Sequence, residues 1–133
     1  MVALDHLNMT VRNVDESIEW YNKVFDFEVV EKKKHKGRNF AVLRSQDSML
    51  CIYEYPELKK PETNTKTHKH YHYGLRIKDR QLWENKMAKE NIEIDHTWQY
   101  PSSYSWYLFD PSGHEIEVVH WNDDKVQFTD DSQ

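Results

Sequence analysis

An internal repeat constrains the fold of this chain more than any other feature of its sequence. Residues 4–11 alternate between apolar and polar side chains and are followed by a helical pattern in residues 15–25. Residues 70–77 then alternate in the same way, and a second helical pattern begins after Asp79. His6 and His72 take matching places in the two alternating segments, 66 residues apart. The repeat predicts two modules with the same order of elements.

Each helical pattern is followed by three segments whose composition favours strands. The predicted strands are residues 4–11, 27–31, 39–44 and 49–55 in the first module, and residues 70–77, 92–100, 104–109 and 115–121 in the second. Each module is therefore predicted to run strand, helix, strand, strand, strand, which places the chain in the α+β class. The length of 133 residues suits one domain with a core of its own. We expect one domain, residues 1–133, with module one in about 3–55, a linker in 56–67, module two in about 68–121 and a polar tail in 122–133.

Alternation within these strands gathers polar side chains on one face of each module. The apolar residues of each first strand are expected to point under the helix, so His6, Asn8, His72 and Arg76 point to the opposite face. Glu117, in the last strand, shares its face with apolar neighbours, where a carboxylate needs a cation or a metal as its partner. If the two sheets pair through a pseudo-twofold axis, these polar faces line one shared cleft.

Two histidines and one glutamate from three strands form a facial set of metal ligands with open coordination positions. His6, His72 and Glu117 suit a divalent ion of Fe, Mn, Ni, Co or Zn, and the ligands alone do not choose among these. The open positions would accept water or two oxygens of a chelating substrate. The sequence therefore predicts a divalent metal ion as cofactor and a small molecule as substrate.

The composition argues against several other functions. The net charge of -5 makes nucleic acid an unsuitable partner, and the three glycines leave no phosphate-cradling loop. No apolar stretch approaches the length of a membrane span, and the N-terminal residues lack the pattern of a secretory leader. Cys51 is the only cysteine, so we expect a cytoplasmic protein without disulfides.

Three longer segments resemble the vicinal oxygen chelate superfamily, which includes glyoxalase I, bleomycin-resistance proteins, fosfomycin-resistance thiol transferases and extradiol dioxygenases. The segments are LDHLNMTVRNVDESIEWYNKVFDF, HYGLRIKD and YLFDPSGHEIEV. The resemblance covers nearly all of residues 3–121 and implies two βαβββ modules that form a cupped, barrel-like mixed sheet with the helices outside. It also implies that His6, His72 and Glu117 are the metal ligands, the same set that the repeat indicates.

The resemblance leaves the subfamily open. Glyoxalase I has a fourth ligand, a glutamate on the last strand of its first module, and that place holds Cys51 here, with Glu54 three residues further on. Extradiol dioxygenases have a tyrosine ten residues before the ligand glutamate, which matches Tyr107, but Glu57 takes the place of their catalytic histidine. Fosfomycin-resistance enzymes share a Ser-x-Tyr sequence, which matches Ser105 and Tyr107, and have a later arginine that this chain lacks.

We therefore expect a divalent-metal-dependent enzyme in which the metal polarises an oxygen of the substrate. A glyoxalase-like lyase (lactoylglutathione lyase type) is the first expectation, and an extradiol-type dioxygenase or a fosfomycin-resistance-type thiol transferase is the alternative. Tyr107 is the candidate catalytic residue, as a hydrogen-bond donor to that oxygen. Asn8, Arg76 and Ser105 are the candidate substrate-binding residues, with Arg76 orienting an anionic group.

A metal-free binding protein of the bleomycin-resistance type is the alternative from another class. Its groove would be lined by aromatic side chains, namely Trp98, Tyr100, Tyr104, Trp106 and Trp121. In either class the modules leave open sheet edges, so we expect a homodimer.

Overall fold

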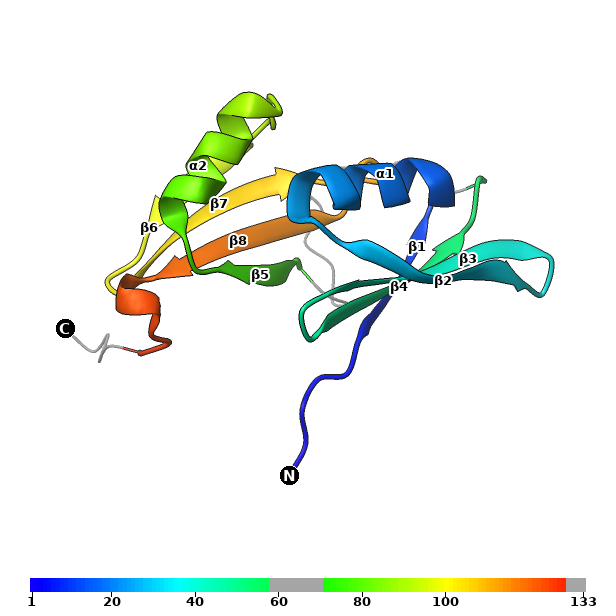
Figure 1. Ribbon diagram of the computed structural model, residues 1–133, viewed down its shortest axis with the longest axis horizontal. Coiled ribbons are helices and arrows are strands. Elements are labelled where there is room, and N and C mark those ends of the chain that lie inside the picture. The colour runs from blue at the N-terminus through cyan, green and yellow to red at the C-terminus, as the bar shows by residue number, and fades with distance from the viewer. Residues whose placement is uncertain (58–70, 129–133) are drawn as a thin grey trace. The chain divides into compact units, whose positions relative to one another are not determined.

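The computed structural model describes residues 1–57 and 71–128, which belong to two compact units, Met1–Pro61 and Glu62–Gln133 (Figure 1). Most of the expected linker, residues 56–67, lies outside the described residues. That the two modules form one domain stays a prediction, and each unit is described by itself.

The first unit is a four-stranded mixed sheet with one helix, in the predicted order of elements. Its elements are β1 (Leu7–Val11), α1 (Val14–Phe25), β2 (Glu28–His35), β3 (Arg38–Ser45) and β4 (Ser48–Glu54). The strands lie in the order β1-β4-β3-β2, with β1 and β4 parallel and the other pairs antiparallel. Met9 and Val11 of β1 are buried, as are Leu43 of β3 and Ile52 of β4, so one face of this sheet forms the core under α1.

Both ends of α1 follow from the local sequence. The Asn13 side chain accepts a hydrogen bond of 2.8 Å from the Glu16 backbone N–H, as an N-cap residue does. Asp26 ends the helix in the left-handed conformation with φ of 60°, a position where glycine is more usual. These observations confirm the helix that the sequence predicted for residues 15–25.

The second unit repeats this architecture. Its elements are β5 (Tyr73–Ile77), α2 (Arg80–Lys89), β6 (His96–Gln99), β7 (Ser103–Phe109), β8 (Glu115–Trp121) and a 3-10 turn at Asn122–Asp124. The strands lie in the order β5-β8-β7-β6, again with one parallel pair, β5 and β8. Neither four-stranded sheet is closed into a barrel, and the predicted α+β class with two βαβββ modules is confirmed.

The pairing register confirms the internal repeat. In the first unit Asn8 of β1 pairs with Cys51 of β4, and in the second Gly74 of β5 pairs with Glu117 of β8. Each residue of the second pair lies 66 residues after its counterpart in the first. The separation of 66 residues between His6 and His72 therefore holds for both strands of the parallel pair.

Some predicted details of the second unit are wrong. In α2, Leu82 is 65% exposed, and Trp83 is the residue that turns inward and packs against Trp106. The strand expected in residues 92–100 is reduced to β6, because Asn91 takes a positive φ of 51° after the helix and the chain pairs with β7 only later.

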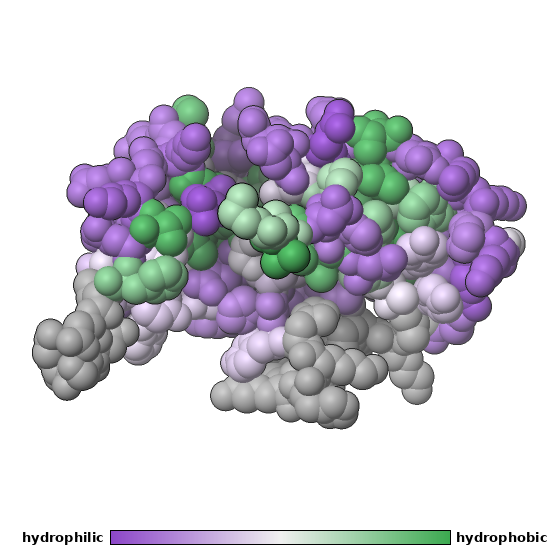
Figure 2. Space-filling view, turned by 90° about the horizontal axis from the view of Figure 1, so that it is seen from below, coloured by the Kyte–Doolittle hydropathy of each residue, from purple (hydrophilic) through white to green (hydrophobic). Residues whose placement is uncertain are grey.

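On the face shown in Figure 2, hydrophilic side chains predominate and apolar ones form separate patches. Among the described residues, no helix has the length and apolar character needed to cross a membrane.

Candidate functional site

One face of the second unit's sheet carries most of the predicted site residues. His96 of β6 pairs with Tyr107 of β7, Tyr107 pairs with Glu117 of β8, and Glu117 pairs with Gly74 of β5. Side chains of directly paired residues lie on the same face of a sheet. The neighbours of this row in β8, Ile116 and Val118, are fully buried on the other face. The alternation expected for the last strand is therefore confirmed.

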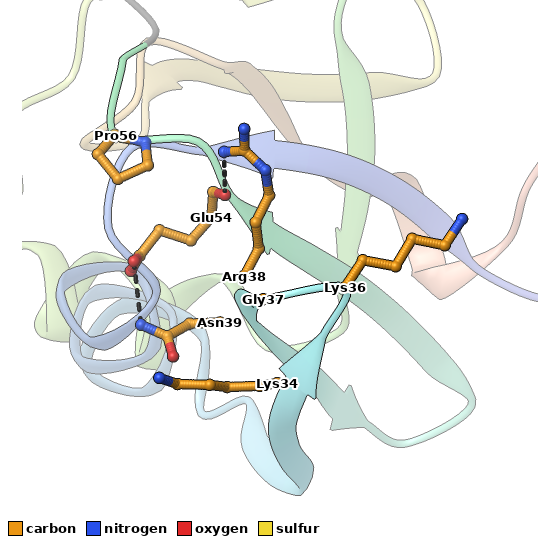
Figure 3. Close-up of a pocket in the computed structure, with 7 residues that line it drawn as sticks. All are labelled: Lys34, Lys36, Gly37, Arg38, Asn39, Glu54 and Pro56. Carbon is orange, nitrogen blue, oxygen red and sulfur yellow. Dashed lines mark hydrogen bonds between the residues drawn. The ribbon is translucent and has the colours of Figure 1, made fainter.

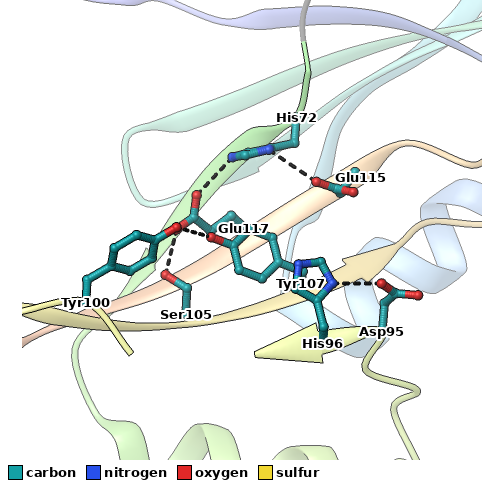
Figure 4. A network of polar contacts seen from close by, with 8 residues as sticks. All are labelled: His72, Asp95, His96, Tyr100, Ser105, Tyr107, Glu115 and Glu117. Carbon is teal, nitrogen blue, oxygen red and sulfur yellow. Dashed lines mark hydrogen bonds and ion pairs between the residues drawn. The ribbon is translucent and has the colours of Figure 1, made fainter. Parts of the chain in front are cut away.

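His72 and Glu117 are in contact on this face (Figure 4). His72 Nε2 lies 2.9 Å from Glu117 Oε1, and the two side chains are 27% and 18% exposed. His72 directly precedes β5 and Glu117 lies in β8, so parallel pairing of these strands brings them together. Two of the three predicted metal ligands are thus in contact within one unit.

The remaining polar atom of each of these side chains also has a neighbour. The Ser105 hydroxyl donates a hydrogen bond of 2.6 Å to Glu117 Oε2. His72 Nδ1 lies 3.2 Å from Glu115 Oε1, at an angle that does not qualify as a hydrogen bond, so this contact is electrostatic. Carboxylates and hydroxyls in these places orient metal-binding side chains in proteins.

Tyr107 lies beside this pair and is 5% exposed. Its hydroxyl is 2.7 Å from the Tyr100 hydroxyl, and its ring packs edge-on against His72 at 5.7 Å between centroids. Burial raises the pKa of the Tyr107 phenol, and the hydrogen bond with Tyr100 and the Glu117 charge raise it further. Tyr107 therefore keeps its proton and can donate it in a hydrogen bond, and its role as the catalytic residue stays a prediction.

The predicted substrate-binding residues have different surroundings. Ser105 is fully buried and bonded to Glu117, so it holds the carboxylate and has no surface to offer a substrate. Arg76 is exposed and, in β5, pairs with Val119 of β8 two residues from Glu117. Asn8 is exposed on β1 of the first unit, so its part in the site stays a prediction.

His6 belongs to the first unit, and its role as the third ligand stays a prediction. Its Nδ1 lies 2.7 Å from Asp5 Oδ2, which leaves Nε2 as the nitrogen available to a metal. Within residues 1–57 and 71–128, no three or more His, Cys, Asp or Glu side chains are arranged as a complete metal site. The ligand atoms in contact are those of His72 and Glu117.

The question of a fourth ligand has a structural answer within the first unit. Glu54 accepts a hydrogen bond of 3.0 Å from Asn39 Nδ2 (Figure 3). It also accepts one of 2.9 Å from the Val14 backbone N–H, so it stabilises the start of α1. Cys51 lies on the opposite face of β4, where burial, together with the Asp5 and Glu31 charges, raises the pKa of its thiol. The Glu54 side chain therefore does not reach the face of β4 on which Cys51 lies.

The aromatic side chains proposed for a binding groove are divided between two faces. Trp98, Tyr100 and Trp121 lie on the face of Glu117, as their pairing register requires. Tyr104 and Trp106 lie on the opposite face, where Trp106 is buried and contacts Trp83 of α2. The prediction that Tyr104 and Trp106 line a groove with the others is wrong, because alternation along β7 turns them toward the helix.

His96 is a site-face residue that the sequence did not predict, and its contact with Asp95 was not predicted either. His96 Nδ1 lies 2.7 Å from Asp95 Oδ2, and its ring stacks on Tyr107 with centroids 4.3 Å apart and planes inclined by 3°. The available signal was the alternation of His96 with Trp98 and Tyr100 toward one face.

Comparisons with known proteins give a consistent result. A family model described as Glyoxalase/Bleomycin resistance protein/Dioxygenase superfamily matches residues 3–118. The metallothiol transferase FosB of Bacillus licheniformis is 24% identical over 120 residues, which span 89% of this chain and 75% of FosB.

Two solved structures share the fold of this chain. The lactoylglutathione lyase of Agrobacterium tumefaciens has a TM-score of 0.65 and 22% identity, and the match covers 89% of this chain and 92% of that protein. A mutant of the fosfomycin resistance protein FosX of Listeria monocytogenes, complexed with Mn(II) and 1S,2S-dihydroxypropylphosphonic acid, has a TM-score of 0.72 and 15% identity, over 92% and 94% of the two chains.

Proposed function

Because this chain belongs to the glyoxalase/bleomycin resistance protein/dioxygenase superfamily, as its motifs predicted, we propose that it is a divalent-metal-dependent enzyme whose small substrate chelates the metal through oxygens. The contact of 2.9 Å between His72 Nε2 and Glu117 Oε1 carries this proposal. Two ligand atoms at right angles on one metal, each about 2.1 Å away, are themselves about 3 Å apart. The observed pair therefore fits two adjacent corners of a coordination sphere.

The surroundings of the pair support the same function. His72 Nε2 shares a hydrogen bond with Glu117 Oε1, and a metal would take the place of the proton in that bond. Glu115 beside Nδ1 would then accept the Nδ1 proton, and Ser105 holds Glu117 through its other oxygen. Bound there, with His6 as the proposed third ligand, a divalent ion of Fe, Mn, Ni, Co or Zn would supply a Lewis acid. Tyr107 would donate a hydrogen bond to the substrate oxygen that gains charge, and Arg76 would attract an anionic group.

The missing fourth carboxylate is the basis on which we rank the candidate reactions. A glyoxalase-like lyase of the type described above uses a glutamate at the place of Cys51, and Glu54 is bound to the start of α1 instead. Ser105 and Tyr107 match the fosfomycin-resistance pattern, and FosB is named as a metallothiol transferase. We therefore rank a metal-dependent transfer of a thiol to a small, oxygen-bearing electrophile ahead of the lyase reaction.

A metal-free binding protein is the second candidate, and one observation favours it. Trp98 and Tyr100 are 60% and 40% exposed on the site face, which suits contact with an apolar ligand. This reading gives no role to the contact between His72 and Glu117. The expected homodimer and cytoplasmic location are part of the proposal for either candidate.

Elemental analysis after dialysis against a weak chelator tests the metal site. We expect about one divalent metal ion per chain in the wild type, and a loss of it in the His72→Ala and Glu117→Gln variants. His35→Ala is the matched control, because His35 is an exposed histidine of the first unit. Absence of metal from the wild type, even after reconstitution, would leave the binding protein as the better reading.

A further inference from the structure

The row of paired residues that contains Glu117 ends in a histidine at the other side of the site face. His96, Tyr107 and Glu117 are directly paired on three adjacent strands. Neighbouring strands are about 4.8 Å apart, so the Cα atoms of His96 and Glu117 are about 10 Å apart. A small molecule held at His72 and Glu117 and extending over Tyr107 spans this distance.

Stacking fixes the orientation of the His96 ring. The ring lies flat against Tyr107, with centroids 4.3 Å apart and an angle of 3° between the planes. Tyr107 is itself held by its contact with the Tyr100 hydroxyl at 2.7 Å. His96 therefore stands beside the candidate catalytic tyrosine in a defined position, although β6 is the edge strand of the sheet.

Asp95 fixes the chemistry of the ring. Its carboxylate lies 2.7 Å from His96 Nδ1, which places a proton on Nδ1 and leaves the lone pair on Nε2. The His96 side chain is 49% exposed, so Nε2 can meet a substrate and exchange protons with water. An imidazole that is oriented by a carboxylate and open at its other nitrogen has the features of a general base.

Two titratable residues of the described part of the chain contact His96. They are Asp95, from the segment before β6, and Tyr107 of β7, whose phenol keeps its proton. No contact between His96 and His72 or Glu117 is recorded in the described residues, so His96 is not part of the proposed ligand set.

We propose that His96, oriented by Asp95, is the proton acceptor for a substrate bound at His72 and Glu117, an inference that rests on the proposed metal-dependent function. Nε2 takes the proton of an acidic O–H or S–H group, and the electron pair of the broken bond stays on that oxygen or sulfur. The imidazolium keeps its Nδ1–H bonded to Asp95 and returns the proton to the product or to water. The total number of protons and electrons is unchanged.

A proton count during ligand binding tests this role without knowledge of the substrate. The probe is acetohydroxamate, which gives up one proton when it chelates a metal through two oxygens, and the protein is loaded with Zn²⁺. Calorimetry in two buffers of different ionisation heat gives the number of protons released to solvent. We expect the His96→Gln variant to release about one proton more than the wild type at about pH 7.5, because a glutamine amide cannot accept the proton that the imidazole takes up.

Acidifying the solution should reduce the difference, because a ring that already carries two protons cannot accept another. Asp95→Asn should release an intermediate number, and the control His35→Gln should match the wild type. Nitrogen NMR of the wild type should show His96 changing from the neutral to the protonated ring as acetohydroxamate binds, which does not depend on any variant.

Each other outcome has a distinct meaning. Equal proton release by wild type and His96→Gln, with no change in the His96 ring, would overturn the role of His96 and leave the metal-dependent function standing. Loss of Zn²⁺ from His96→Gln would show that His96 is needed for the metal site itself and would overturn its role as proton acceptor. Failure of the Zn²⁺-loaded wild type to bind acetohydroxamate would overturn both proposals.

Discussion

Ser105 determines where the second oxygen of Glu117 points. Its hydroxyl is fully buried and donates a hydrogen bond of 2.6 Å to Oε2, while Oε1 faces His72. A carboxylate held in this way enters metal coordination with little loss of conformational freedom. The sequence suggested substrate binding for Ser105; its buried bond to Glu117 favours the prediction that it positions this proposed ligand.

Replacing Ser105 by alanine should weaken metal binding while the fold is kept. We expect metal affinity to fall about 10- to 100-fold and the free energy of unfolding to fall by about 1–3 kcal/mol, because Oε2 loses its donor. Competition with a chelator and urea denaturation measure the two effects. Ser103→Ala is the matched control on the same strand, since Ser103 is also buried; equal affinities of the two variants would contradict the positioning role.

The Cys51 thiol should be slow to react in the folded protein. Burial raises its pKa, so the thiolate becomes the major form only above the ordinary thiol pKa of about 8.5. At about pH 8, alkylation by iodoacetamide should be slower than in the urea-unfolded chain, and the two rates should approach each other as the pH rises. Folded protein that reacts as fast as unfolded protein at pH 8 would show that Cys51 is an activated thiol.

At the scale of single elements, the start of α1 depends on a residue from the end of β4. Glu54→Gln should lower the free energy of unfolding by about 0.5–2 kcal/mol, because the charged acceptor for the Val14 N–H is lost at a helix N-terminus. Metal content should not change. The control Glu57→Gln removes an exposed ion pair with Arg38 and should lower the free energy of unfolding less than Glu54→Gln does. Loss of metal in Glu54→Gln alone would restore Glu54 as a candidate ligand.

The sequence predicted the helices well, because residues next to each helix determine where it begins. Asn13 and Asp79 begin the two helices because their side chains accept backbone N–H groups three residues on, a feature visible in the sequence. Alternation also placed His72 and Glu117 on one face, although it could not give the distance between them. Alternation did not reveal the pair of Asp95 and His96. The stacking of His96 on Tyr107 depends on the register between β6 and β7. The exposed residues of an edge strand specify that register only weakly.

At the scale of the whole molecule, the repeat divides the proposed ligands between two units. Met1–Pro61 contains His6, and Glu62–Gln133 contains His72 and Glu117. Each unit has its own sheet and its own buried residues, so each can open and close with a stability of its own. A metal that takes ligands from both units would make these stabilities depend on each other.

Hydrogen exchange measured separately for each unit tests this coupling and the predicted role of His6. Metal at 100 times its dissociation constant stabilises the state that binds it by about 2.7 kcal/mol. In the wild type, amide protection should therefore rise in β4 of the first unit and in β8 of the second. In His6→Ala the rise should be confined to the second unit, where His72 and Glu117 still bind metal weakly, while His35→Ala should behave as the wild type. If metal protects only the second unit of the wild type, His6 is not a ligand and the remaining coordination must come from the substrate or from residues of the second unit itself.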